Sequence, residues 1–267
     1  MIIRSNDVAG RPGSTQSRVV LALVVAAAVA VYACNSGPTP PTPPPDGGAP
    51  TTPGGTSDRV RPGVTTLCKH GPGGRFLVSV GATGTNPTTK TVTVDDGQCV
   101  DVANVDPASK DDVIVAIAEN AVAFAAIDRI VMQHGEDDAR TMTQTSTVSF
   151  EGSHGAIVTY LNNAVVTLCK VGLAGTFQYQ IGPADAFHPL SLSGGQCSTI
   201  ASIPPAARAD DVVVTIRENA SNTYRLDRVT MVLGDADPAA PRTLTGSSSV
   251  SFEGVHGGVV TFFNVAP

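Results

Sequence analysis

Reactive residue types occur twice along this chain of 267 residues, in the same order each time. Each copy holds a Lys directly after a Cys, then a second Cys, a Glu and an Asn, side chains that form covalent bonds or move protons. The matched pairs are Cys68 and Cys169, Lys69 and Lys170, Cys99 and Cys197, Glu119 and Glu218, and Asn162 and Asn264. The offsets lie between 98 and 102 residues. This spacing predicts two homologous domains, here called repeat 1 (64–163) and repeat 2 (164–267).

Lysine is the most informative of these residues because the chain otherwise uses arginine. It has thirteen arginines and four lysines, and the one lysine of repeat 2 is Lys170, the match of Lys69. Alternate side chains of a strand point to opposite faces, so Lys170 shares a face with Val166 and Leu168. The amine is therefore predicted to lie on the apolar side of its strand.

The same strand parity places the Glu and the Asn of each copy on apolar faces. Glu218 follows Val214 and Ile216 at every second position, and Asn264 follows Phe262. The matching faces of repeat 1 carry Val115, Ile117 and Glu119, and Val158, Tyr160 and Asn162. Three polar residues per repeat are thus predicted to face the core.

The elements that position these residues are predicted to be strands. Val, Thr and Ile dominate after residue 63, Gly (27) and Pro (20) are frequent, aromatic residues make up 4%, and no segment keeps a helical period. Strands are expected near 64–69, 75–80, 90–94, 98–103, 112–119, 127–133, 145–151, 155–162, 165–171, 176–181, 188–192, 196–201, 211–218, 225–233, 248–253 and 257–264. The prediction is an all-β fold of two tandem antiparallel β-sandwiches.

The arrangement of the polar residues resembles a family of bacterial surface domains. Each repeat has a Lys in its first strand, a Glu at the end of a mid-domain strand and an Asn in its last strand. In this pattern it resembles the prealbumin-like, collagen-adhesin B-type (SpaA-like) domains, which implies an Ig-like sandwich. In that family the Lys and Asn side chains join in an intramolecular isopeptide bond that the Glu promotes. Over residues 64–264, the resemblance implies bonds between Lys69 and Asn162, promoted by Glu119, and between Lys170 and Asn264, promoted by Glu218.

The implied chemistry is consistent with burial, which favours a neutral, nucleophilic amine and raises the pKa of the carboxyl. The Cys before each Lys departs from the family pattern, so a disulfide in place of the isopeptide bond is one alternative. A buried Lys–Glu ion pair with Asn as a hydrogen-bond partner is another, and a Lys that reaches solvent from the strand end is a third.

Four cysteines form one pair in each repeat. Cys68 and Cys99, and Cys169 and Cys197, each enclose about thirty residues. Small exported domains with weak cores commonly use such disulfides. Metal binding and free thiols are the alternatives, but no Cys-x-x-Cys motif or nearby His set accompanies the pairs. Intradomain disulfides are therefore predicted.

The N-terminal segment predicts export. Residues 1–33 carry three arginines and then a 15-residue apolar run, too short for a spanning helix and typical of a signal peptide. Val31-Tyr32-Ala33-Cys34 resembles a bacterial lipobox, apart from Tyr32, and predicts that Cys34 is acylated. Cleavage after Ala33 and an uncleaved anchor are the alternatives. Residues 34–63 are rich in Pro, Gly and Thr and predict a disordered stalk.

Other candidate sites are weaker. His154 and His256 occupy matching Glu-Gly-x-His-Gly segments. These segments predict hairpin tips in which glycines make the turn, rather than metal sites. No metal, cofactor or enzyme motif is predicted, and the formal net charge of −6 argues against nucleic-acid binding.

We therefore expect an exported protein, lipid-anchored at the bacterial cell surface or the periplasmic face of a membrane, with a structural or adhesive role. Its partners would be the membrane and a surface protein or glycan that the sequence does not identify. It would not be an enzyme, beyond catalysing its own cross-links. The alternative is an extracytoplasmic module that binds a small molecule or glycan, and an enzyme with a separate substrate comes third.

Overall fold

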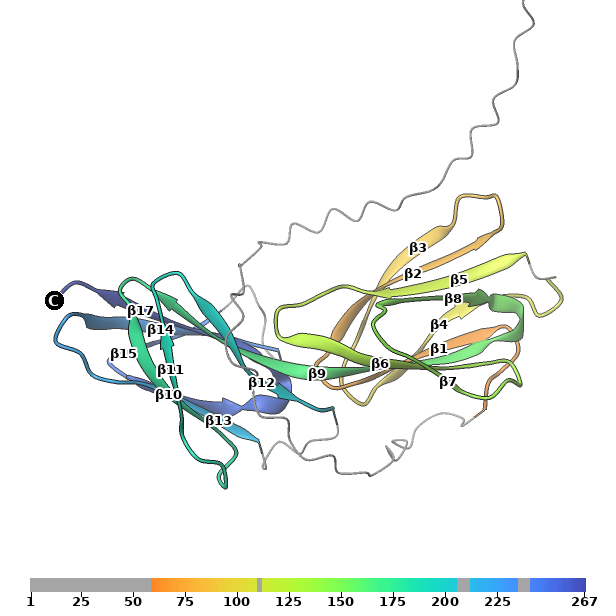
Figure 1. Ribbon diagram of the computed structural model, residues 1–267. Coiled ribbons are helices and arrows are strands. Elements are labelled where there is room, and N and C mark those ends of the chain that lie inside the picture. The colour runs from red at the N-terminus through yellow and green to blue at the C-terminus, as the bar shows by residue number, and fades with distance from the viewer. Residues whose placement is uncertain (1–58, 110–111, 206–211, 235–240) are drawn as a thin grey trace, which may run out of the picture. The chain divides into compact units, whose positions relative to one another are not determined.

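The computed structural model describes residues 59–109, 112–205, 212–234 and 241–267 (Figure 1). The predicted signal peptide, the predicted lipidation site Cys34 and the predicted stalk up to residue 58 lie outside these residues. Within the described ranges, no helix is long and apolar enough to cross a membrane.

Repeat 1 is built from strands joined by short loops, as its period-two pattern predicts. The strands are β1 (Val64–His70), β2 (Gly74–Ala82), β3 (Thr88–Val94), β4 (Cys99–Asn104), β5 (Val113–Glu119), β6 (Ala125–His134), β7 (Arg140–Met142), β8 (Thr147–Glu151) and β9 (Ala156–Val171). Only the short strand β7 was not predicted.

Repeat 2 has the same series of elements. Its strands after β9 are β10 (Gly175–Ile181), β11 (His188–Leu192), β12 (Cys197–Ile203), β13 (Val213–Glu218), β14 (Arg225–Leu233), β15 (Arg242–Thr245), β16 (Ser249–Glu253) and β17 (Gly258–Val265). The unpredicted strand is again a short one, β15, which pairs with β14.

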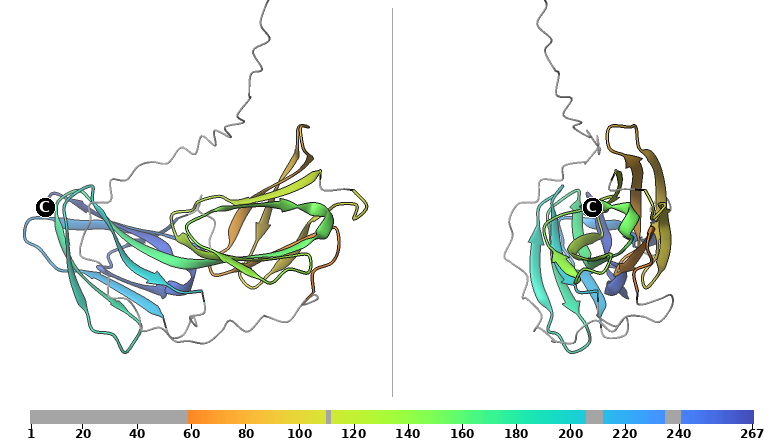
Figure 2. Two further views of the ribbon diagram at one scale, coloured as in Figure 1. Left: turned by 45° about the vertical axis from the view of Figure 1, so that its right-hand side comes forward. Right: turned by 90° about the vertical axis from the view of Figure 1, so that its right-hand side faces the viewer.

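The strands of each repeat form two sheets, and Figure 2 shows them as two layers. One sheet has the order β3-β2-β5-β8 in repeat 1 and β11-β10-β13-β16 in repeat 2. In the other sheet β9 pairs with β1 and β6 in repeat 1, and with β12 and β17 in repeat 2. The all-β sandwich prediction is confirmed. The structure differs from the predicted antiparallel sandwich in one respect, because the strand pairs β1–β9 and β9–β17 are parallel.

Strand β9 belongs to both repeats. Its first half pairs with β6 up to Ala164, and its second half pairs with β12 from Ala164 onward. The predicted strands 155–162 and 165–171 are therefore one strand of 16 residues. The ladder continues because no Gly or Pro interrupts it and because Val165 N–H donates to the carbonyl of Phe124.

Each repeat has its own cluster of buried apolar side chains. Phe76 and Tyr160 meet edge to face in repeat 1, with ring centroids 5.0 Å apart. Phe177 and Phe262 do the same in repeat 2 at 5.2 Å. Such a pair contributes about 0.5–1.5 kcal/mol beyond the area it buries. These two ring pairs thus occupy the same place in their repeats.

The two segments predicted as hairpin tips have a different role. Each is a 3-10 turn, Gly152–His154 or Gly254–His256. β8 pairs with β5, whereas β9 pairs with β6 and β1, so the first turn carries the chain from one sheet to the other. The hairpin prediction was wrong because adjacent strands were assumed to pair. The turn chemistry was correct, since Gly155 and Gly257 have φ of 73° and 67°.

Candidate cross-link sites

Three strands bring Lys69, Glu119 and Asn162 together in repeat 1. Lys69 lies in β1, Glu119 ends β5 and Asn162 lies in β9. Lys69 Nζ is 3.6 Å from Glu119 Oε1, and Asn162 Nδ2 donates to the same oxygen at 2.8 Å. One carboxylate oxygen therefore contacts both nitrogens.

Repeat 2 has the same arrangement. Lys170 Nζ is 3.4 Å from Glu218 Oε1, and Asn264 Nδ2 donates to that oxygen at 2.9 Å. Each lysine also donates to the backbone carbonyl of the residue after it, at 3.2 Å and 3.3 Å. The same geometry therefore occurs in both repeats.

The parallel strand pairing explains why the Lys and the Asn are close. Lys69 lies opposite Tyr160, and Lys170 lies opposite Phe262. The Asn is two residues farther along in each case, so its side chain emerges on the same face. The Glu reaches the pair from the opposite sheet, across the core.

All six side chains are buried. The exposed fraction is 0% for both lysines and at most 7% for Glu119, Glu218, Asn162 and Asn264. The core-facing placement predicted from strand parity is confirmed, and solvent-reaching lysines are excluded. The cross-link itself stays a prediction.

Several polar atoms of the sites have no hydrogen-bond partner. Among the described residues these include Oε2 of Glu119 and Glu218 and Oδ1 of Asn162 and Asn264. An unsatisfied buried polar atom costs about 1–3 kcal/mol. The same atoms lack a partner in both repeats, so the two sites carry the same cost.

Burial shifts the pKa values of Lys69, Lys170 and Glu119 toward the neutral forms of these side chains. Loss of solvation lowers the pKa of Lys69 from 10.5 to about 8, although Glu119 opposes this. The same cause lowers the pKa of Lys170 and raises the pKa of Glu119. A neutral amine is a nucleophile, whereas an ammonium is not. Burial therefore increases the fraction of each lysine amine that is neutral and can react.

Two glycines make room for the carboxylates, and the sequence reasoning missed them. A Cβ on Gly74 would lie 2.3 Å from Glu119 Oε1, and one on Gly175 would lie 2.4 Å from Glu218 Oε1. Neither glycine has a positive φ. The missing Cβ is therefore required by the site rather than by the backbone. The sequence does contain a sign of these glycines, because both repeats have a Gly-x-Phe motif, ending at Phe76 and at Phe177.

The predicted disulfides are confirmed. Cys68 bonds Cys99 across β1 and β4, and Cys169 bonds Cys197 across β9 and β12. Each first cysteine directly precedes the site lysine, and strand parity puts its side chain on the opposite face. The disulfides therefore fix the lysine-bearing strand without touching the buried carboxylate.

Comparison with known proteins gives only weak similarity. No protein-family model and no curated protein matches the chain. Among solved structures, the major pilin of Streptococcus pyogenes is 12% identical, with a TM-score of 0.32, over 75% of this chain and 96% of the pilin. The T-13 major pilin protein from the same species is 10% identical, with a TM-score of 0.31, over 78% and 98% of the two chains. These values are too low to support a conclusion about function.

Proposed function

We propose that this chain is an exported structural or adhesive surface protein whose two β-sandwich domains are each braced by a Lys–Asn isopeptide bond. The observation that carries the proposal is the buried Lys–Glu–Asn set, which occurs twice with one geometry. Export, the acylated Cys34 and the stalk over 34–63 belong to the proposal through their sequence patterns alone.

The contacts support formation of a Lys–Asn amide bond with loss of ammonia in each site. The neutral Nζ of Lys170 attacks Cγ of Asn264, a C–N bond forms, and the bond from Cγ to Nδ2 breaks. Glu218 Oε1 takes a proton from Nζ and delivers it to Nδ2, which leaves as ammonia. The oxygen is placed for this transfer because it contacts both nitrogens. No oxidant or cofactor is needed.

The bond would have a mechanical purpose. It joins the first strand of a sandwich to its last strand and closes a ring of nearly the whole repeat. Closing a loop of that size raises stability by about 4.5 kcal/mol in the chain-entropy model. A pulling force applied at the two ends of the domain would then be carried by covalent bonds. This property suits a protein that holds a surface against a partner.

The ion-pair alternative explains less of the geometry. A buried ion pair gains little over apolar residues of similar size, because desolvation offsets the attraction. It accounts for the hydrogen bond from Asn Nδ2 to the Glu, but it leaves the Asn Oδ1 without a partner. Reaction removes the charge from the lysine, and with it the desolvation cost of a buried ammonium.

Intact mass spectrometry tests the proposal directly. We expect the wild-type protein, after allowance for two disulfides and for any processing at the N-terminus, to be lighter than its sequence by two ammonias. Lys170→Arg should restore one ammonia and Lys69→Arg the other, because arginine keeps the charge but is no comparable nucleophile. A wild-type protein with the full unmodified mass would contradict the cross-link and leave the ion pair as the explanation.

The rate of cross-linking should rise with pH in repeat 1. The pKa of Lys69 is about 8, so its neutral form increases as the pH approaches that value. The chain would be folded at mildly acidic pH, where the amine is protonated, then shifted to higher pH and followed by mass. We expect a rate that increases and levels off above about 8. A rate that falls as the pH rises would mean that protonated Glu119 is required from the start.

A further inference from the structure

The two cross-link sites differ at one position that adjoins the carboxylate. Tyr224 follows Glu218 by six residues, and Ala125 follows Glu119 by six residues. The register supports this equivalence, because Leu226 lies opposite Asn264 in β17 just as Ile127 lies opposite Asn162 in β9. Repeat 2 thus carries a phenol ring where repeat 1 carries a methyl group.

In repeat 2 the Tyr224 ring covers the site. Its centroid lies 5.3 Å from Lys170 Nζ, and its hydroxyl donates to the carbonyl of Asn219 at 3.3 Å. The ring therefore spans from the start of β14 back to the residue after Glu218. An aromatic face beside a buried amine excludes water from it.

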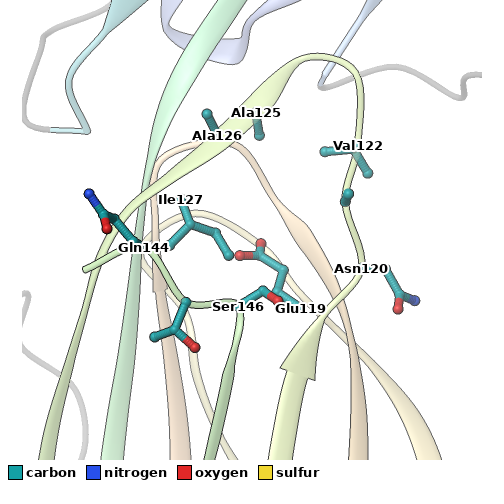
Figure 3. Close-up of a pocket in the computed structure, with 10 residues that line it drawn as sticks. Glu119, Asn120, Val122, Ala125, Ala126, Ile127, Gln144 and Ser146 are labelled. Carbon is teal, nitrogen blue, oxygen red and sulfur yellow. The ribbon is translucent and has the colours of Figure 1, made fainter. Parts of the chain in front are cut away.

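Repeat 1 has a cavity at the corresponding place. Its volume is about 380 Å³, and Figure 3 shows the Glu119 carboxylate between Ile127 and Ser146 on its wall. Ala125 and Asn120 also line it. The volume is within the range of about 300–1,000 Å³ that is usual for small-molecule pockets.

The walls of this cavity match the residues that surround the ring in repeat 2. The counterparts are Glu119 and Glu218, Asn120 and Asn219, and Ala125 and Tyr224. The cavity therefore lies where a phenol ring lies in the other repeat. Its chemistry suits the same group, since Ile127 and Ala125 offer apolar surface and Glu119 Oε2 is a buried acceptor without a hydrogen bond.

We propose that this cavity is a binding site for a phenol ring, which takes in repeat 1 the place that Tyr224 holds in repeat 2. The ring would lie against Ala125 and Ile127, and its hydroxyl would donate to Glu119 or to the carbonyl of Asn120. The ligand is either a small free phenol or the side chain of a tyrosine on a partner. In both cases it would lie beside the Glu119 carboxylate, as the Tyr224 ring lies beside Lys170 in repeat 2.

Titration of the full folded chain with p-cresol, followed by NMR chemical shifts, tests this proposal. We expect saturable binding at one site per chain, with a Kd on the order of 1 mM because the ligand is small. Ala125→Tyr should abolish binding by filling the cavity from within. Tyr224→Ala should open a second cavity and raise the stoichiometry to two. N-acetyltyrosinamide distinguishes the two ligand sources. If the ligand is a tyrosine side chain of a partner, N-acetyltyrosinamide should bind as p-cresol does, and if it does not bind, the ligand is a small free phenol.

Control variants and ligands distinguish binding at this site from non-specific binding. Ala123→Tyr adds the same ring to the same loop at an exposed position and should leave binding unchanged. Toluene, which lacks the hydroxyl, should bind at least several-fold more weakly. Equal binding to wild type and Ala125→Tyr, or shifts that never saturate, would overturn the proposal. The mass of each variant is measured in parallel, so a missing cross-link would be recognised separately from a missing phenol site.

Discussion

Replacing Glu218 by Gln should abolish the cross-link of repeat 2 and leave that of repeat 1 intact. Glutamine is close in shape, but it cannot take a proton from Lys170 Nζ and pass it to Asn264 Nδ2. The protein should therefore gain the mass of one ammonia, and a peptide map should show Lys170 and Asn264 unjoined. Two separate hydrophobic clusters are the reason to expect no effect on repeat 1.

The same substitution should lower the stability of repeat 2 sharply. Opening the ring loses about 4.5 kcal/mol, which corresponds to a fall in Tm of roughly 20–35 °C for a domain of about one hundred residues. Differential scanning calorimetry should then show two transitions in place of one. Glu119→Gln is the matched variant and should move the transition of repeat 1 instead. An unchanged Tm with Glu218→Gln, together with an unchanged mass, would remove the catalytic role of the glutamate.

Gly175→Ala tests the geometry of the site without changing its chemistry. The added methyl would lie 2.4 Å from Glu218 Oε1 and 3.0 Å from Lys170 Cε, so the carboxylate would be displaced. Cross-linking of repeat 2 should slow, although Lys170, Glu218 and Asn264 are all present. Gly74→Ala provides the same test in repeat 1.

Removing a disulfide should destabilise its repeat while leaving its cross-link in place. Replacing Cys169 and Cys197 by Ala opens a loop of 28 residues, which costs about 3.5 kcal/mol and lowers Tm by roughly 15–30 °C. The ammonia loss should persist, because the disulfide lies on the opposite face of β9 from Lys170. Calorimetry and intact mass of the double variant measure the two effects separately.

The result also decides between two interpretations of the paired cysteines. If the disulfide replaced the isopeptide bond, the wild type would show no ammonia loss, and the variant would lose all of its covalent bracing in repeat 2. If the two bonds act together, Cys68 and Cys99 should contribute to repeat 1 by a similar amount. Their loop encloses 31 residues, so the expected cost is again about 3.5 kcal/mol.

Much of the site could be predicted because the evidence for it is local or repeated. Strand parity depends only on neighbouring residues, and it placed Lys170, Glu218 and Asn264 on the core side, where their exposed fractions are 0%, 6% and 7%. The repeat itself served as an internal comparison. It identified the cysteine partners, Cys68 with Cys99 and Cys169 with Cys197, which both bond as predicted.

Other features depend on contacts between distant segments, which no local pattern specifies. The sequence predicted strands on both sides of Asn163, but only the pairing of Ala164 with β6 and β12 made β9 continuous. The turns at His154 and His256 contain the expected glycines. Whether they join paired strands or cross between sheets is decided by which edges the sheets leave free.

The sequence by itself determined the strand content, the faces of the strands, the disulfide partners and the identity of the candidate reactive residues. Only the tertiary structure decided that β1 and β9, and β9 and β17, are parallel neighbours, and that one oxygen of Glu119 or Glu218 contacts both nitrogens. It also distinguished a cavity beside Ala125 from a ring at Tyr224. The reason is physical: side-chain direction follows from the backbone of a few residues, whereas distances within a site arise from packing across the core between segments far apart in the chain.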